Sequence, residues 1–171
     1  MLIAFAGDRS WKCDEMAVRC LSGLAESCGP SLWVILAEGT GVPESFLLAV
    51  AVVGGVNLIE ADEDVLDPHL HDPRYRPDFL IVAHRYLPGS TATRELAIRA
   101  IAAGVTTCLI EDESGDARSI RADDYRLQPS RAARARAALA GVGPGSRSAD
   151  RPGIAPRGVQ GPNPGRKGVV R

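Results

Sequence analysis

The stretch Asp78-Phe-Leu-Ile-Val-Ala-His84, followed by Pro88-Gly-Ser-Thr-Ala-Thr-Arg-Glu95, decides the fold of this chain. Its first half is an apolar run, which is typical of a buried strand. Its second half is a turn of small residues that opens a helical pattern, with Ser90 placed as the N-cap. Free N–H groups and the positive end of the helix dipole point out of such a turn, so it can seat an anion. An ordinary turn between strand and helix, with Ser and Thr acting as caps, has the same appearance.

The same alternation of strand and helix runs along the chain. Apolar, strand-like segments cover residues 2–6, 32–37, 56–59, 78–83 and 105–110. Helical patterns follow the first, second and fourth of them, and residues 44–53 are apolar nearly all round, which predicts a deeply covered helix. The pattern predicts an α/β fold: a doubly wound, Rossmann-like parallel sheet of about five strands in a three-layer arrangement.

The carboxyl ends of all parallel strands lie at one edge, and ligands bind there where the strand order reverses. Three turns leave this edge, and their candidate ligand-binding residues are Gly7, Asp8, Arg9, Ser10, Gly39, Thr40, Gly41, Gly89, Ser90, Thr91 and Thr93. Arg9 suits a phosphate or a surface ion pair. Asp8 suits a ribose hydroxyl or the cap of the next helix. Trp11 could stack on a base, but packing over the helix is favoured.

Composition bounds the class of protein. The chain has 171 residues, of which 45% are hydrophobic, enough for one domain with a core. It has no apolar stretch long enough to span a membrane, and its N-terminal apolar run is too short for a signal peptide, so we expect a cytoplasmic protein. The four cysteines form no CxxC motif, so we expect free thiols in a reducing compartment.

The charge is divided unevenly. Residues 1–125 hold 10 Lys and Arg against 20 Asp and Glu, whereas residues 126–171 hold 10 Lys and Arg and a single acid, Asp150. We therefore divide the chain into a Rossmann-like domain, 1–126, and a basic tail, 127–171, with a short helix at 130–140 followed by a disordered Gly/Pro/Arg-rich segment. The tail could make weak, salt-sensitive contact with nucleic acid, or neutralise its own acidic domain.

Two further groups of residues have the chemistry of a possible site. The long acidic connection 60–77 contains Asp67, His69, His71 and Asp72, but no helical metal-binding spacing, and we expect no metal and no cofactor. His84 ends the fourth strand at the ligand edge, where it could act as an acid or base or cap the strand.

These motifs resemble those of the SLOG superfamily, and within it the DUF2493 or YspA (cpYpsA-related) proteins. The resemblance covers about residues 1–111. Gly7-Asp8-Arg9-Ser10-Trp11 is similar to the family's Gly-Ser-Arg-x-Trp loop, with Asp8 in place of Ser. Glu38-Gly39-Thr40-Gly41 keeps the glycines of the second signature but lacks its Asp, and Pro88–Thr93 resembles the third with Ser90 and Ala92 in place of glycines.

The resemblance implies binding of a nucleotide or a nucleotide-derived small molecule. More distant relatives, the LOG or lysine decarboxylase-like enzymes, hydrolyse the N-glycosidic bond of nucleoside monophosphates. Leu96 occupies the position of their catalytic glutamate, so a hydrolase would need another carboxylate, such as Glu38 or Glu44. The sequence leaves three hypotheses: a small-molecule binding protein, a nucleotide-directed hydrolase, and a nucleic-acid accessory protein acting through its tail. It also leaves open a homo-oligomer that covers the apolar helix at 46–53.

Overall fold

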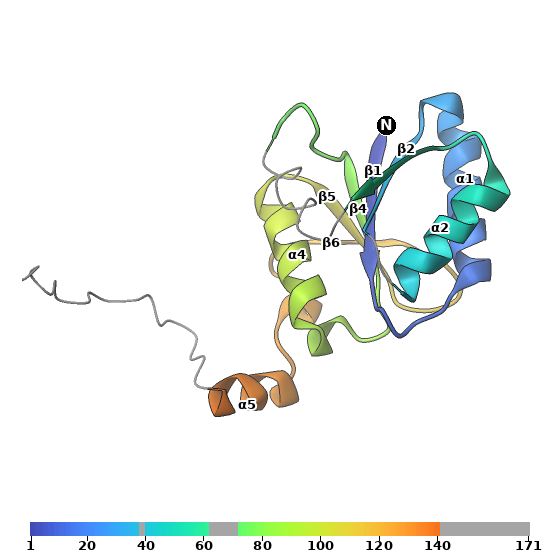
Figure 1. Ribbon diagram of the computed structural model, residues 1–171. Helices are drawn as coiled ribbons and strands as arrows, with labels where there is room; N and C mark the ends of the chain where they lie inside the picture. Colours follow the sequence, from blue (N-terminus) through green and yellow to red (C-terminus); the bar gives the residue numbers. More distant parts are fainter. Residues whose placement is uncertain (38–39, 62–71, 141–171) are drawn as a thin grey trace, which may run out of the picture.

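The computed structural model describes residues 1–37, 40–61 and 72–140. It has the predicted α/β architecture, with one sheet between layers of helices (Figure 1). The strands are β1 (Leu2–Gly7), β2 (Trp33–Ala37), β3 (Asn57–Ala61), β4 (Phe79–Ala83), β5 (Thr106–Ile110) and β6 (Arg118–Ile120). The α-helices are α1 (Asp14–Cys28), α2 (Val42–Val53), α4 (Thr91–Ala102) and α5 (Arg131–Leu139). Short 3₁₀ turns are η1 (Gly29–Ser31), η2 (Leu87–Gly89) and η3 (Tyr125–Leu127).

The strand order is β3-β2-β1-β4-β5-β6, and it reverses between β1 and β4. β1 to β5 are parallel, as predicted, and Gly7 at the end of β1 pairs with Ala83 at the end of β4. These are the five parallel strands that the sequence predicted, and β6 adds an antiparallel edge strand beside β5 that it did not. β6 has three residues and one buried side chain, Ile120, so it is too short to show an alternating pattern in the sequence.

Two cores lie on opposite faces of the sheet. α1 and α2 cover one face, where Phe5 of β1 stacks on Phe46 of α2 with ring centroids 4.0 Å apart. α4 covers the other face, over Ile35 and Leu80. Because successive side chains of a strand point to opposite faces, the continuous apolar runs of β1, β2 and β4 fill both cores at once.

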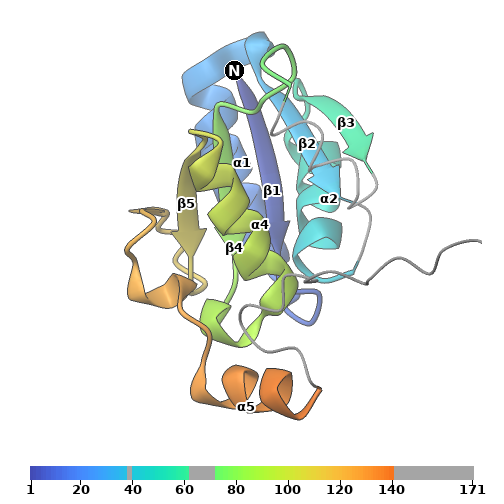
Figure 2. The same ribbon diagram turned by 90° about the vertical axis from the view of Figure 1, so that its left-hand side faces the viewer.

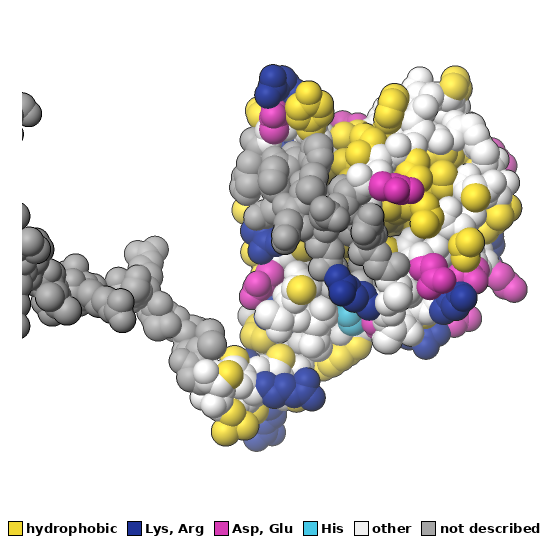
Figure 3. All heavy atoms as spheres, in the orientation of Figure 1, with side chains coloured by type: hydrophobic (Ala, Val, Ile, Leu, Met, Phe, Trp, Pro, Cys, Tyr) yellow, Lys and Arg dark blue, Asp and Glu magenta, His cyan; other side chains and the backbone are white. Residues whose placement is uncertain are grey.

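The prediction that α2 is deeply covered was wrong. Phe46 and Ala49 are fully buried, but Leu47, Leu48 and Val52 keep 43%, 46% and 71% of their surface exposed. The outer face of the helix therefore carries apolar side chains, and Figure 3 shows hydrophobic surface over α2 and β3. An apolar sequence all round a helix does not by itself bury both faces, since α2 packs on a single layer of the sheet.

The C-terminal part of the described chain returns to the carboxyl edge. η3 contributes Leu127 to the second core, and α5 lies beyond that edge, below α4 in Figure 2. α5 matches the short helix expected at 130–140, although none of its residues is buried. The segment 62–71, which holds Asp67, His69 and His71, and the tail beyond 140 lie outside the described residues, so the predictions made for them stay predictions.

No helix in the described ranges has the length and apolar character that a membrane crossing requires.

Candidate ligand site at the carboxyl edge of the sheet

The turn after β1 is fixed to its neighbours by main-chain hydrogen bonds. The N–H of Asp8 donates to the carbonyl of Ala83, 3.0 Å away, which closes the reversal between β1 and β4. The carbonyl of Asp8 accepts from the N–H groups of Trp11, at 3.2 Å, and Val42, at 3.1 Å. The second of these bonds uses an amide of the first turn of α2, so that amide does not face a ligand.

Glycines allow the first and second turns to touch. A Cβ on Gly7 would lie 2.2 Å from the carbonyl oxygen of Ala83 and 2.8 Å from Cγ1 of Val42. Gly41 has a φ of 74°, and a Cβ there would lie 2.4 Å from the carbonyl oxygen of Arg9. Thr40 Oγ1 also donates to this carbonyl, at 3.2 Å. The predicted convergence of these two turns is confirmed, and both glycines are needed for close packing of main chain on main chain.

The side chain of Asp8 folds over its own turn. Its Oδ1 accepts from the N–H of Ser10, at 2.8 Å, and from the hydroxyl of Ser10, at 2.6 Å. The N-cap of α1 is Cys13, so the alternative in which Asp8 caps this helix is wrong. Burial raises the pKa of Asp8, but the hydrogen bonds from Ser10 and the charges of His84 and Arg85 outweigh it and hold the pKa below its usual value.

His84 follows β4 directly and lies opposite Asp8 across the reversal. Its ring nitrogen Nδ1 accepts from the main-chain N–H of Tyr86, 3.0 Å away, and the main-chain N–H of His84 donates to the carbonyl of Ile110. The residue is 9% exposed. Burial lowers the pKa of His84, while the charge of Asp8 opposes that shift. The neutral imidazole therefore carries its proton on Nε2, because Nδ1 acts as an acceptor.

The third turn begins α4 as the sequence predicted. Ser90 is the N-cap, and its Oγ accepts from the N–H of Thr93 at 3.3 Å. Thr91, the first residue of the helix, is exposed. The carbonyl of Pro88 accepts from the N–H of Ser130, at 2.9 Å, and from the guanidinium of Arg94, at 3.4 Å. The chain after β6 thus supports the turn before α4.

Trp11 is part of the core, which confirms the packing interpretation. It is 2% exposed, and the guanidinium of Arg85 lies 5.0 Å from the centre of its ring. Arg85 is held there by Glu113, at 2.6 Å. Trp11 Nε1 is buried without a hydrogen-bond partner among the described residues. Sequence reasoning missed Arg85 and Glu113, because an arginine after a strand and an acidic run after the next strand show no sign of pairing.

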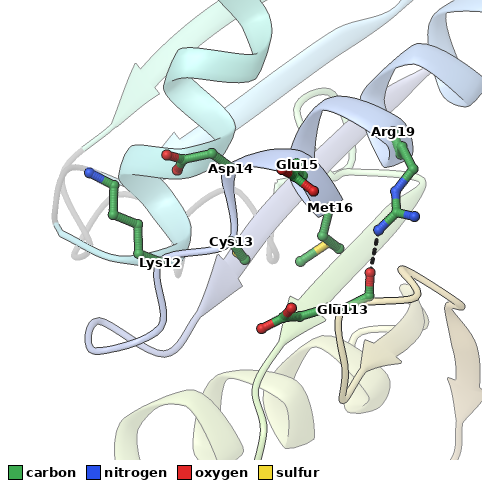
Figure 4. Close-up of a pocket in the computed structure, with 7 residues that line it drawn as sticks. All are labelled: Lys12, Cys13, Asp14, Glu15, Met16, Arg19 and Glu113. Atoms are coloured by element: carbon green, nitrogen blue, oxygen red, sulfur yellow. Dashed lines mark hydrogen bonds between the residues drawn. The ribbon is translucent and has the colours of Figure 1, made fainter.

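A separate hollow of about 350 Å³ lies between the start of α1 and the loop after β5. Figure 4 shows Cys13, Met16 and Glu113 beside it, with Arg19 donating to the carbonyl of Glu113. Its lining also includes the acidic side chains of Asp14 and Glu15. None of the residues predicted to bind a ligand lines this hollow, and its wall carries cations as well as carboxylates.

The structure therefore brings together Gly7, Asp8, Arg9 and Ser10 of the first turn with Thr40 and Gly41 of the second. The third turn, with Gly89, Ser90, Thr91 and Thr93, leaves β4, the strand next to β1. Gly39, and the carboxylate candidate Glu38, lie outside the described residues. No group of His, Cys, Asp and Glu suited to a metal ion occurs in the described part of the chain.

Comparison of the chain with protein-family models, with curated proteins and with solved structures gave no match.

Proposed function

We propose that this protein binds a nucleotide-like small molecule at the carboxyl edge of the sheet, with the phosphate at the start of α4, in the manner of the SLOG proteins that its sequence resembles. The observation that carries the proposal is the reversal of strand order between β1 and β4. In open α/β sheets the crevice at such a reversal is where ligands bind. We place the protein in the cytoplasm as part of the same proposal.

The start of α4 suits the phosphate better than the start of α2. The first amide of α2, from Val42, already donates to the carbonyl of Asp8. α4 begins with Thr91, which is exposed and adds a hydroxyl, and its dipole presents a positive end to the edge. Arg9 is exposed on the neighbouring turn and can supply a planar, charged donor pair.

Binding without N-glycosidic hydrolysis is favoured by the first turns of α4. Leu96, which stands where LOG-type enzymes have their glutamate, packs against the second core. The adjacent Glu95 is exposed. A neighbour in a helix is turned by about 100°, so Glu95 does not replace a carboxylate at position 96.

The test is the melting temperature of the full chain with adenine and guanine nucleotides at millimolar concentration. A ligand present at about 100 times its Kd stabilises the folded state by about 2.7 kcal/mol, which gives a clear upward shift. We expect Arg9→Ala to weaken binding about tenfold or more, because a charged hydrogen-bond donor to phosphate is lost.

Lys12→Ala is the matched control, since Lys12 is an exposed cation of the same loop but lines the separate hollow beside α1. It should leave the shift unchanged. A panel that leaves the wild-type melting temperature unmoved would rule out the proposal, and equal losses in both variants would rule out the placement at the first turn.

A further inference from the structure

We propose that Asp8 and His84 together recognise a sugar hydroxyl of the bound nucleotide, with the carboxylate as acceptor and Nε2–H as donor. This inference rests on the proposed function, because it names the part of the ligand that sits between the ends of β1 and β4. It assigns the phosphate and the sugar to different groups along the same edge.

The first argument is that each side chain has one orienting contact and one polar atom left over. Oδ1 of Asp8 takes both hydrogen bonds from Ser10, which leaves Oδ2 without a partner in the described ranges. Nδ1 of His84 accepts a hydrogen bond from the N–H of Tyr86, so Nε2 is the ring nitrogen that can bond to a ligand. Among the described residues, Trp11 Nε1 is the side-chain nitrogen that is fully buried and has no hydrogen-bond partner. Nε2 of His84 is not such an atom, so it keeps contact with solvent although the residue is only 9% exposed.

The second argument concerns the two charge states. The pKa of Asp8 lies below its usual value, so the carboxylate is ionised at neutral pH. The pKa of His84 is also lowered, chiefly by burial, so the imidazole is neutral. The charge of Asp8 raises the pKa of His84, and the charge of Arg85 lowers the pKa of Asp8. Glu111, which follows β5, forms an ion pair with Arg126. Asp8 and His84 each follow a residue of the pair Gly7 and Ala83, and each affects the pKa of the other, so one acceptor and one donor lie near each other at this edge.

The third argument decides which part of a nucleotide fits this pair. A phosphate would meet the carboxylate of Asp8 as a like charge, which costs free energy at short range. A hydroxyl donates and accepts at once, so it satisfies Oδ2 and Nε2 together. A sugar hydroxyl meets this requirement with a single uncharged oxygen, whereas a base needs a donor and an acceptor on two separate atoms. An acidic side chain that hydrogen-bonds the ribose is also common in dinucleotide-binding sheets, where it comes from another strand.

The experiment compares adenosine monophosphate with its 2′,3′-dideoxy analogue by titration calorimetry on the full chain. Wild type should bind the hydroxylated nucleotide about tenfold to a hundredfold more tightly, as expected for a hydrogen bond to a charged group. Asp8→Asn keeps an oxygen for Ser10 but replaces the second oxygen by a donor. His84→Asn keeps an oxygen near the position of Nδ1 for Tyr86 but removes Nε2.

In Asp8→Asn the ratio of the two dissociation constants should fall to about one, because the bond to the charged group is lost, and in His84→Asn it should fall several-fold, because a neutral donor is lost. Melting of the ligand-free variants checks that the turns still fold. Equal binding of the two nucleotides by wild type, a preference that survives Asp8→Asn, or one that His84→Asn leaves unchanged, would overturn this inference and leave the proposed function standing. Failure of wild type to bind either of these nucleotides, or any adenine or guanine nucleotide of the melting panel, would overturn both, so the two failures are distinguishable.

Discussion

The two halves of the carboxyl edge are built in different ways. On the β1 and β2 side, one loop packs on another. The carbonyl of Asp8 accepts a hydrogen bond from the N–H of Val42, and the carbonyl of Arg9 accepts one from the hydroxyl of Thr40. On the β4 and β5 side, the turn before α4 is supported by the chain after β6, through the bond from Ser130 to Pro88. The first half is closed on itself, whereas the second leaves the start of a helix open to solvent.

The difference shows that a glycine in a turn either is required by close main-chain packing or is a small residue that a larger one could replace. Gly7 and Gly41 leave no room for a Cβ, because main-chain oxygens lie within 2.2 to 2.5 Å of where it would be. At Gly89 the nearest atoms belong to the ring of Tyr86, at 2.9 Å, and this side chain is 60% exposed. The sequence presents all three as small residues in a ligand-like turn, and only the first two are packing constraints.

The largest effect should come from Gly7→Ala. Its new methyl group would overlap the carbonyl of Ala83 and the side chain of Val42, which cannot both move without shifting β4 and α2 away from β1. We expect the free energy of unfolding to fall by about 3 kcal/mol, at the upper end of the range for overpacking. Urea denaturation followed by circular dichroism measures this.

Two other glycines calibrate that prediction. Gly89→Ala should cost less than about 1 kcal/mol, because the exposed ring of Tyr86 can turn away. Gly23 lies within α1, and a Cβ there would meet nothing within 4 Å beyond the backbone of its own helix, so Gly23→Ala should stabilise the fold by about 0.5–1 kcal/mol. A loss at Gly89 as large as that at Gly7 would remove the distinction between the two halves of the edge.

The next largest effect should come from Arg126→Met, which tests the support of the second half. The guanidinium binds Asp124 at 2.7 Å and Glu111 at 2.8 Å, and 12% of its side chain is exposed. Its loss should cost about 2 kcal/mol, below the roughly 3–5 kcal/mol of a fully buried pair, because the carboxylates retain some solvent. Arg74→Met is the control, since the side chain of Arg74 is 79% exposed in its pair with Asp72 and its loss should have no measurable effect.

The effect of Arg126→Met should depend on pH. The hydrogen bond from Arg126 lowers the pKa of Asp124, against the smaller opposing effect of burial. A carboxyl whose pKa is lowered in the folded state contributes stability above its unfolded pKa, about 3.9, and loses it as the pH falls through the folded value. The gap between wild type and variant should be full at pH 7 and close below about pH 4. A gap that stays constant at acid pH would show that packing of the side chain, and not its charge, holds η3.

Most of the fold could be predicted from the sequence, because long apolar runs and caps are local signals. β4 and the start of α4 were located to within a residue, and Ser90 caps as expected. β6 was missed because three residues carry no period. The outer face of α2 was misjudged because an apolar residue does not reveal whether another layer covers it, and Leu48 is 46% exposed.

The candidate site could be predicted less well, because its residues come together through tertiary contacts. Topology placed the first and second turns side by side, and that prediction is confirmed. The sequence could not show that the carbonyl of Asp8 uses the first amide of α2, nor that Ser10 orients its carboxylate. It also gave no sign that Arg85 covers Trp11, since a cation and a ring far apart in the chain show no pairing pattern.

The smallest effect should come from Ser90→Ala, which changes the open half of the edge at the helix start itself. The hydroxyl accepts from the N–H of Thr93 at 3.3 Å, and its loss should cost about 1 kcal/mol. Ser130→Ala is the matched control, because Ser130 caps α5 in the same way, at 3.1 Å, but α5 has no buried residue. Its loss should fray α5 without changing global unfolding. If a phosphate sits at the start of α4, bound nucleotide should offset part of the loss at Ser90, since the anion replaces the missing acceptor there. Measuring both variants with and without nucleotide therefore separates a structural cap from one that also belongs to the ligand site: an equal loss in both conditions would assign Ser90 to the helix alone.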